Sequence, residues 1–497
     1  MFTPAPTTAN SVSFDAIDAY VEEQMRHLHI PGVSLAIVEG DRLVHLHGFG
    51  KAQPGGRPPT PQTPFLIGSL TKSITALAVM QAVEAGKIEL DAPVQRYLPW
   101  FRVMDPQASA QMTVRHLLVQ TSGLPASAGE SILAHIDNSP GAAERQARAL
   151  SSLVPAHPVG DTFEYSNSNY QLLGLIIEAV TGKAYADYVQ NSILTPLRMN
   201  HSHYPDPTGA KNGLAMGHQY WFGRPVEAPD IPLPYGAMAA GLLISTAEDL
   251  AHYLIAHLNG GCYHDAQLLS PAGIAELHRG AAEFGVAGLG PIVGLLTKNM
   301  EMGQYGMGWN VNKIGQDELI WHGGTMPNFG GFMALLPEQK KGLVLLFNTC
   351  HHWLNPVLAE VGTGAVALLV GEKVKLPFTS IIRWILPAQL LIPTFQIVDV
   401  AATLRRAKRW GTDSQRRRQA VQAGWPRVVF PLVFNAWVAL LALRPLLSRR
   451  RGYLKLYMPD FSLIAAICGG LALLTSFLRA GLLIRAWRKP VTRMTDS

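Results

Sequence analysis

The sequence is short of charge and of cysteine. Only 15% of its 497 residues are charged, against about 25% in an ordinary soluble chain, while 48% are hydrophobic. The apolar content excludes an intrinsically disordered protein. Three cysteines (Cys262, Cys350 and Cys468) exclude a disulfide scaffold or a cysteine-rich zinc module. Because one hydrophobic core rarely exceeds ~250–300 residues, we expect more than one structural unit.

Acidic residues are scarce in the last quarter of the chain. Residues 378–497 hold 19 Lys and Arg, four Asp and no Glu, whereas residues 1–377 hold 22 basic and 31 acidic residues. The overall charge of +6 is therefore the sum of a large acidic part and a small, strongly basic one. A basic surface for nucleic acid is not indicated, and we expect no nucleic-acid partner.

The basic part contains three long apolar stretches, near residues 378–400, 428–447 and 461–484. Each reaches the ~20 residues that a helix needs to cross a bilayer. Three buried helices of a soluble domain are the alternative, but this part holds no amphipathic helix to cover them. Arg383 and Asp399 lie near the two ends of the first stretch, where long side chains reach the interface. A lipid bilayer is thus the expected partner of residues 378–497.

Basic residues also predict an orientation. The segments after the first and third stretches (404–427 and 485–497) share one side of the membrane and carry 12 basic residues, against four between the second and third. Since the more basic side is usually cytoplasmic, residues 1–377 are expected outside the cytoplasm of a multi-pass membrane protein. Residues 1–12, expected to be flexible, show no secretory signal. Either the natural start lies upstream of Met1 or the catalytic domain is cytoplasmic, and both alternatives stay open.

Residues 13–365 have the pattern of one domain, joined by a linker at 366–377 to the membrane segment at 378–497. Strands are expected close to both of its ends and helices between them, which predicts an α/β (α+β) fold with one antiparallel sheet closed by the two chain ends. The expected strands are 33–38, 43–48, 329–336 and 342–348, and the expected helices are 13–29, 69–87, 168–191 and 246–259.

Ser69-Leu70-Thr71-Lys72 is the first candidate catalytic motif. If Ser69 begins a helix, Lys72 lies one turn later on the same face. A lysine amine there can accept the serine proton if burial lowers its pKa. Alone the motif is weak, because a serine cap followed by a surface lysine has the same spacing.

Tyr165-Ser166-Asn167 is the second motif, in a loop of small polar residues before a helix. The tyrosine oxygen could pass a proton between nucleophile and leaving group, and the asparagine could hold a substrate amide. A helix-capping loop is the alternative interpretation.

His322-Gly323-Gly324-Thr325 is the third motif and lies at the end of a strand-like run. The glycines permit close approach of a ligand to the strand edge. The Thr325 N–H could then join that of Ser69 in an oxyanion hole. A second copy of the short pattern, His278-Arg279-Gly280, ends a helical run and is interpreted as a helix C-terminus.

The order of the three motifs, each in its own structural context, is typical of serine penicilloyl enzymes. Over roughly residues 13–350 the sequence resembles the serine β-lactamase-like hydrolases, a group that includes class C β-lactamases, DD-peptidases, D-aminopeptidases and family VIII esterases. Further stretches that carry the resemblance are 112–118, 121–125, 174–182, 196–199, 240–250 and 305–309.

The resemblance implies a β-lactamase/DD-peptidase-like fold and a role for each motif residue. Ser69 is expected to be the acylated nucleophile, Lys72 to assist its activation, and Tyr165 to act as general base and then acid. The resemblance also implies that Asn167 binds a substrate amide and that Gly324 lines the strand edge. His322 stands at a position that lysine often holds in relatives. The backbone N–H groups of Ser69 and Thr325 are expected to form the oxyanion hole.

Histidine at 322 weakens recognition of a substrate carboxylate, because histidine is mostly uncharged at neutral pH. We therefore expect a membrane-anchored serine hydrolase for an ester or a peptide-like amide, including D-amino-acid substrates, rather than a true β-lactamase. The trailing membrane segment is similar to that of membrane-anchored D-aminoacyl peptidases of nonribosomal peptide pathways. The alternatives are a catalytically silent penicillin-binding-like domain for cell-wall peptide or a protein partner, and a sensor attached to a transport or signalling module.

No metal and no cofactor are expected. His201-Ser202-His203 with Asp206 suggests a metal site but lacks the further clustered ligands of a zinc hydrolase. Glycine pairs occur at 55–56, 260–261 and 469–470, without the strand–loop–helix context of a phosphate-binding loop.

Overall fold

The computed structural model divides the chain into two compact units, Met1–Arg383 and Trp384–Ser497. It describes residues 14–52, 54–134, 136–205, 213–228, 233–283, 303–375, 384, 387–412, 430–447 and 451–488. The expected flexible segment 1–12 and the end of the expected linker lie outside these residues. Each unit is described by itself.

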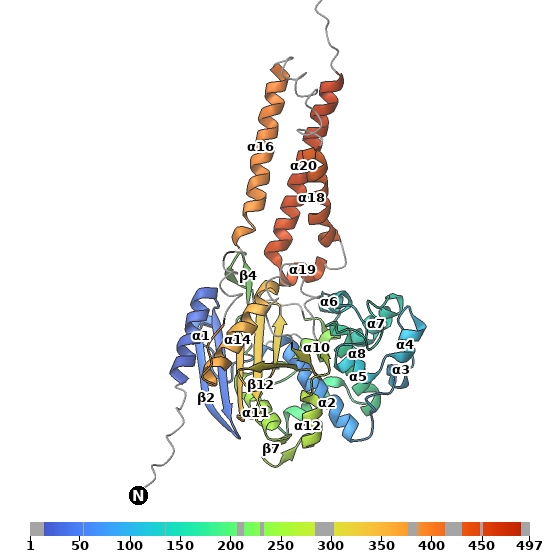
Figure 1. The fold of residues 1–497 in the computed structure, drawn as a ribbon, viewed down its shortest axis with the longest axis vertical. Helices are drawn as coiled ribbons and strands as arrows, with labels where there is room; N and C mark the ends of the chain where they lie inside the picture. The colour runs from blue at the N-terminus through green and yellow to red at the C-terminus, as the bar shows by residue number, and fades with distance from the viewer. Residues whose placement is uncertain are drawn as a thin grey trace, which may run out of the picture. The chain divides into compact units, whose positions relative to one another are not determined.

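An eight-stranded antiparallel sheet forms the centre of the first unit, in the order β2-β1-β14-β13-β12-β11-β10-β9. Val33 pairs with Phe347 and Val38 with Gly342, so the first strand lies beside the last long one, as the blue and yellow strands of Figure 1 show. The predicted antiparallel sheet closed by the chain ends is confirmed. Its strands are β1 (Gly32–Glu39), β2 (Arg42–Gly50), β9 (Ala282–Glu283), β10 (Gln304–Tyr305), β11 (Asn310–Ile314), β12 (Asp317–Met326), β13 (Phe329–Leu336) and β14 (Lys341–Phe347).

Smaller strands complete this unit. A three-stranded sheet has the order β15-β4-β5, and two pairs join β3 to β6 and β7 to β8. Their bounds are β3 (Phe65–Leu66), β4 (His218–Trp221), β5 (Arg224–Glu227), β6 (Ile244–Ser245), β7 (Cys262–Tyr263), β8 (Ala266–Gln267) and β15 (Thr349–Cys350).

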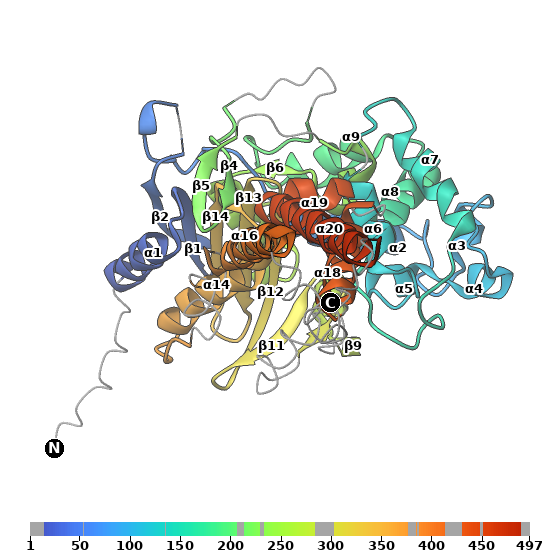
Figure 2. The same cartoon turned by 90° about the horizontal axis from the view of Figure 1, so that it is seen from above.

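Helices cover both faces of the large sheet. On β13, the side-chain position of Gly330 faces Leu358 of α14, and that of Gly331 faces Leu70 beside the serine motif. Because alternate strand residues point to opposite faces, α14 covers one face and the serine-bearing turn the other. Helix α1 packs beside α14, with the Tyr20 hydroxyl donating to the Val361 carbonyl at 3.3 Å. Figure 2 shows α1 and α14 together on one side and α2 and α8 on the other.

Three of the expected helices are present with shifted ends, but the one expected at 168–191 is divided at Gly182 into α8 (Asn167–Thr181) and α9 (Tyr185–Val189). Helix α2 stops at Glu84 before the left-handed Gly86 (φ +68°), and α8 stops at Thr181 before Gly182. The helices of this unit are α1 (Phe14–Leu28), α2 (Thr71–Glu84), α3 (Val94–Tyr97), α4 (Pro106–Gln111), α5 (Val114–Leu118), α6 (Ala126–Ala134), α7 (Ala142–Arg148), α8 (Asn167–Thr181), α9 (Tyr185–Val189), α10 (Met238–Gly241), α11 (Ala247–Leu258), α12 (Pro271–His278) and α14 (Asn355–Leu369). Short turns of helix are η1 (Pro54–Gly56), η2 (Gly68–Leu70), η3 (Ala149–Ser152), η4 (Gln190–Leu194), η5 (Tyr235–Ala237) and η7 (His352–Leu354).

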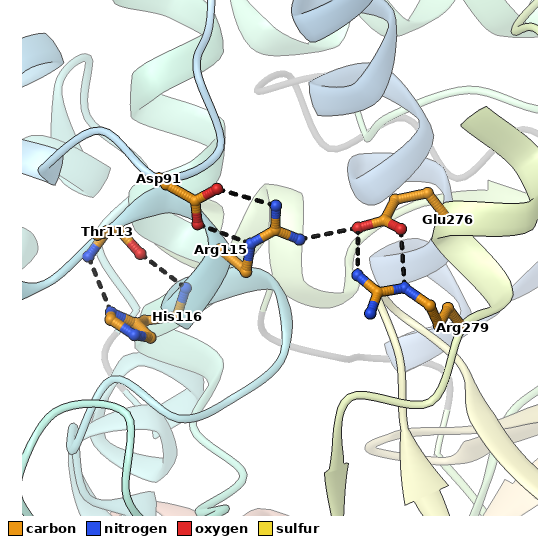
Figure 3. A network of polar contacts seen from close by, with 6 residues as sticks. All are labelled: Asp91, Thr113, Arg115, His116, Glu276 and Arg279. Atoms are coloured by element: carbon orange, nitrogen blue, oxygen red, sulfur yellow. Dashed lines mark hydrogen bonds and ion pairs between the residues drawn. The ribbon is translucent and has the colours of Figure 1, made fainter. Parts of the chain in front are cut away.

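Stretch 112–118, one of those that carry the family resemblance, takes part in a network of ion pairs and hydrogen bonds (Figure 3). Arg115 of α5 bonds to Asp91 at 2.7 Å and to Glu276 of α12 at 2.8 Å, and Glu276 also holds Arg279. The Thr113 side chain accepts the His116 N–H and so caps α5. These residues tie together segments that are distant in sequence, so this stretch supports the fold.

The second unit contains α16 (Leu391–Thr412), α18 (Phe430–Leu447), α19 (Arg451–Tyr457) and α20 (Pro459–Arg488). Helices α16 and α18 both pack against α20. The three stretches that were expected to span a membrane differ in the length of their apolar helices. Within the described residues, one helix (Pro459–Gly481) is long and apolar enough to cross a bilayer, and Leu432–Arg444 is a shorter apolar segment.

The first stretch, expected as a helix at 378–400, lies only in part within the described residues. Most of residues 376–386 lie outside the described part, and α16 begins at Leu391 and continues into the basic residues from Arg405 onward. The apolar part of α16 alone is therefore shorter than the ~20 residues that cross a hydrocarbon layer of ~30 Å, and a pass by this stretch would need the residues before Leu391 as well.

Candidate active site

Ser69 lies in η2, the tight turn that leads directly into α2, as its motif predicted. Gly68 before it has φ +56°, and a Cβ there would lie 2.5 Å from the Thr325 nitrogen. Only glycine satisfies both conditions, since other residues would be strained and would collide with backbone. Ser69 is partly exposed, so a substrate can reach this residue.

Lys72 lies one turn along and is fully buried. Its Nζ lies 3.0 Å from Ser69 Oγ, 2.7 Å from Asn167 Oδ1 and 2.7 Å from the Ala240 carbonyl oxygen. All three partners are neutral. Burial without a counter-charge therefore lowers the pKa of Lys72 well below its ordinary value.

Tyr165 and Asn167 come from the loop that enters α8. The Lys72 Nζ lies 5.0 Å from the centre of the Tyr165 ring. Gln120 holds this loop, because its side-chain oxygen accepts the Ser166 N–H at 3.0 Å and its carbonyl accepts the Glu164 N–H at 2.9 Å. The second motif is thus brought against the first by a fixed loop.

The third motif lies on β12, beside the serine turn. Strand β11 pairs with β12 only as far as Trp321, so among the described strand pairs residues 322–326 have a partner on the β13 side alone. Thr325 contributes its backbone beside Gly68, and its side chain donates to Asn355 Oδ1 at 2.6 Å. A free strand edge therefore borders the serine.

Gly324 has a use that the sequence interpretation missed. It was expected to line the edge for a ligand, but a Cβ at this residue would lie 2.0 Å from the Ile67 carbonyl oxygen. Its missing side chain admits the serine-bearing turn itself. At Gly323, by contrast, the nearest atoms to an added Cβ are 3.8 Å away, on Trp321.

His322 is buried and neutral. Its Nδ1 lies 2.6 Å from the Gly323 carbonyl oxygen and its Nε2 3.2 Å from the Tyr305 hydroxyl. A carbonyl only accepts, so Nδ1 carries the proton and Tyr305 donates to Nε2. Burial first, and the Lys72 charge second, lower the pKa of His322 to about 3. This agrees with the expectation of an uncharged group at this position.

Sequence reasoning did not single out several supporting residues. Tyr305 lies within the stretch 305–309 that carried the resemblance, but no role was assigned to it. Asn169 was also passed over: it accepts from the Ser122 hydroxyl at 2.6 Å and donates to Gln120 at 2.5 Å. Ser122 could have been noticed from the sequence, because it lies in the stretch 121–125 that carries the family resemblance. Nothing local signalled that the Ala240 carbonyl would meet Lys72.

The rejected motifs have structural uses. Ser202 and the His201 N–H both bond to Asp249, at 2.6 and 2.9 Å, which fixes this loop to α11. Asp206 lies outside the described residues. His278 ends α12, as its interpretation as a helix C-terminus predicted.

Comparisons with known proteins identify the family. The family model described as Beta-lactamase matches residues 17–359. Protein flp of Staphylococcus aureus (strain N315) is 29% identical over 363 residues, covering 72% of this chain and 68% of that one. Penicillin-binding protein 4 of Amycolatopsis lactamdurans is 31% identical over 257 residues, or 50% of this chain and 65% of that one.

Solved structures give the same result. The octameric penicillin-binding protein homologue from Pyrococcus abyssi has a TM-score of 0.60 at 28% identity, with 77% of this chain and 81% of that one covered. The crystal structure of SurE has a TM-score of 0.56 at 27% identity, covering 74% of this chain and 76% of that one.

Proposed function

The chain belongs to the β-lactamase family of serine hydrolases and penicillin-binding proteins, and from this premise we propose that it hydrolyses an ester or amide through an acyl-enzyme on Ser69. One observation carries the proposal: a buried lysine, whose partners among the described residues are all neutral, lies 3.0 Å from the hydroxyl of a partly exposed serine. Every motif position that the chemistry needs is filled.

The partners of Lys72 support this lysine as the base, in place of Tyr165, to which the family resemblance gave that role. A neutral amine has two N–H donors and one lone pair. Asn167 Oδ1 and the Ala240 carbonyl oxygen can only accept, so they take the two N–H groups. The Ser69 hydroxyl is the remaining neighbour that can donate, and it therefore points its proton at the lone pair. Lowering the pKa of Lys72 populates this neutral form near neutral pH.

The reaction follows from this arrangement. Ser69 Oγ attacks the substrate carbonyl carbon while its proton passes to Lys72 Nζ, and the N–H groups of Ser69 and Thr325 stabilise the oxyanion. Tyr165, beside the Lys72 amine, delivers a proton to the leaving group as the bond to it breaks. Water then attacks the acyl ester with the proton transfers reversed, which regenerates Ser69.

The site favours neutral peptide-like acyl groups. The unpaired edge of β12 at residues 322–326 offers backbone groups to an extended substrate. His322 is uncharged, and both of its ring nitrogens are occupied by protein groups, so it offers no cation for a substrate carboxylate. We therefore propose esters and amides, including D-amino-acid derivatives, ahead of β-lactams as substrates.

The test is a panel of substrates and one covalent probe. Full-length protein should turn over short-chain esters or D-amino-acid amides faster than penicillins, and a fluorophosphonate should label it. Ser69→Ala should lose both turnover and labelling. Persistent labelling of Ser69→Ala would overturn the nucleophile, and binding of wall peptide without any acyl-enzyme would favour a silent penicillin-binding domain.

We also propose that residues 378–497 anchor the protein by three passes through the cell membrane. Helix α20 is long enough for one pass. Large apolar side chains of α16 and α18, such as Phe395 and Trp437, are exposed within this unit, as lipid-facing residues would be. Arg479 of α20 pairs with Asp399 of α16 at 2.7 Å, which neutralises two charges among apolar helices.

The basic segments support an extracytoplasmic catalytic domain, and one cysteine can test this. Cys262 is partly exposed, whereas Cys350 and Cys468 are buried. A membrane-impermeant maleimide should label Cys262 in intact cells, with Cys262→Ser as the control. Labelling only after lysis would show a cytoplasmic domain, and release of the protein by alkaline carbonate would contradict the anchor.

A further inference from the structure

Two histidines of β2, the edge strand of the large sheet, contact a carboxylate of helix α1. His45 Nε2 lies 2.9 Å from Asp18 Oδ1, and His47 Nδ1 lies 2.5 Å from Asp18 Oδ2. The histidines are on β2 and the aspartate is on α1, the helix that covers this face. Donor atoms of the three residues all lie within 4.8 Å of one another.

The strand explains why the two histidines act together. Residues two apart on a strand point to the same face, so His45-Leu46-His47 directs both imidazoles toward α1. Asp18, in the second turn of α1, offers one carboxylate oxygen to each ring. The set of two imidazoles and one carboxylate matches zinc sites, in which donor atoms ~2.0–2.2 Å from the metal are roughly 3.3 Å apart. A small outward shift of the donors would admit the ion.

The surroundings hold the rings in place and leave one side open. Phe14 stacks on His45 with ring centres 5.0 Å apart, and Phe49 stacks on His47 at 4.2 Å. The side chains of Asp18 and His45 are 16% and 20% exposed, whereas that of His47 is 45% exposed. An ion can therefore enter from solvent, and water can fill the fourth position of a tetrahedral site.

We propose that Asp18, His45 and His47 form a binding site for Zn²⁺ that fastens α1 to the edge of the sheet. The site is separate from the catalytic one, because β2 and β12 are four strands apart in the sheet order, roughly 19 Å at the usual spacing. Its role is structural: the metal links the start of the domain to the strand that begins the sheet. The sequence-based expectation of no metal considered only the other His-x-His motif, at residues 201–203.

The test uses chelator-treated, full-length protein in detergent, titrated calorimetrically with Zn²⁺. We expect one equivalent to bind, and Asp18→Asn, His45→Gln and His47→Gln each to weaken binding at least about tenfold, since even partners that only orient ligands contribute that much. His201→Gln is the matched control: His201 also lies beside a carboxylate, with Nδ1 3.7 Å from Asp249, but should bind normally.

Cobalt gives a second readout that does not depend on stability. Co²⁺ should produce the visible absorption of a tetrahedral site in the wild type and in His201→Gln, and lose it in His47→Gln, whose exposed side chain can be replaced without harm to the fold. Zn²⁺ should raise the melting temperature of the wild type alone among the wild type and the three site variants. The proposal would be overturned if the wild type bound no stoichiometric Zn²⁺, or if His45→Gln and His47→Gln bound Zn²⁺ as tightly as the wild type does. The three residues would then form an ion pair alone.

Discussion

Replacing Asn167 by aspartate tests whether Lys72 works as a neutral base. The Asn167 side-chain oxygen lies 2.7 Å from the Lys72 Nζ, and no carboxylate of the described residues bonds to that amine in the wild type. Asn167→Asp keeps the size and shape of the side chain but places a negative charge against the amine. The charge stabilises the ammonium form, so it should raise the pKa of Lys72.

The magnitude follows from charge pairs at similar distances. An opposite charge within ~4–6 Å typically shifts a pKa by ~1–3 units in favour of the charged form. At a pH below the wild-type pKa of Lys72, its neutral, active fraction should then fall roughly 10–1000-fold, and the loss should shrink as the pH rises toward the new pKa. The rate of acylation should rise with pH in both proteins, but the rise in Asn167→Asp should lie ~1–3 pH units higher.

The assay is single-turnover acylation followed by mass spectrometry from pH 5 to pH 10. Asn167→Ala is the matched control, because it also loses the amide but adds no charge. It should be slower at every pH without a comparable upward move of the profile. An acylation profile that stays in place in Asn167→Asp, or moves to lower pH, would refute the neutral-lysine mechanism.

Three further predictions concern other parts of the domain. Gly68→Ala should destabilise the fold by about 1–3 kcal/mol and abolish acylation, because the residue has φ +56° and no room for a Cβ; thermal melts and probe labelling would measure this, and a stable, active variant would contradict it. The pKa of His322 is about 3 in the folded protein, so below pH ~6.5 the unfolded chain binds a proton at this residue that the folded protein does not bind. The free energy of unfolding should therefore fall by up to about 1.4 kcal/mol per pH unit below ~6.5. Denaturant titrations should show a shallower fall in His322→Gln. Arg115→Ala should cost about 1–2 kcal/mol through loss of its two partners and leave acylation unchanged at 25 °C; a slowed acylation step would instead place Arg115 in the active site.

The sheet could be predicted from the sequence because its signals are local. The runs at 33–38 and 342–348 are short, apolar and bounded by turns, and they pair directly as β1 with β14. The membrane segment was harder. Arg479 and Asp399 are 80 positions apart, and neither residue alone reveals that α20 and α16 pair their charges. Hydropathy also did not locate the start of α16 at Leu391.

The candidate site could be predicted as a set of residues but not as a mechanism. Spacing placed Lys72 one turn from Ser69, and loop composition placed Asn167 at a helix start. The lowered pKa of Lys72 depends on burial and on the Ala240 carbonyl, which comes from a segment 168 positions away. The proposed zinc site was missed for the same reason, because Asp18 meets His45 only after α1 folds onto β2.

The intact mass of the protein after exposure to an acylating substrate shows whether Ser69 is the nucleophile. One acyl adduct is expected on the wild type, located by peptide mapping to the fragment that contains Ser69, and no adduct on Ser69→Ala. An adduct that persists on Ser69→Ala, or a wild type that turns over substrate while Ser69 stays unmodified at every time point, would contradict this role.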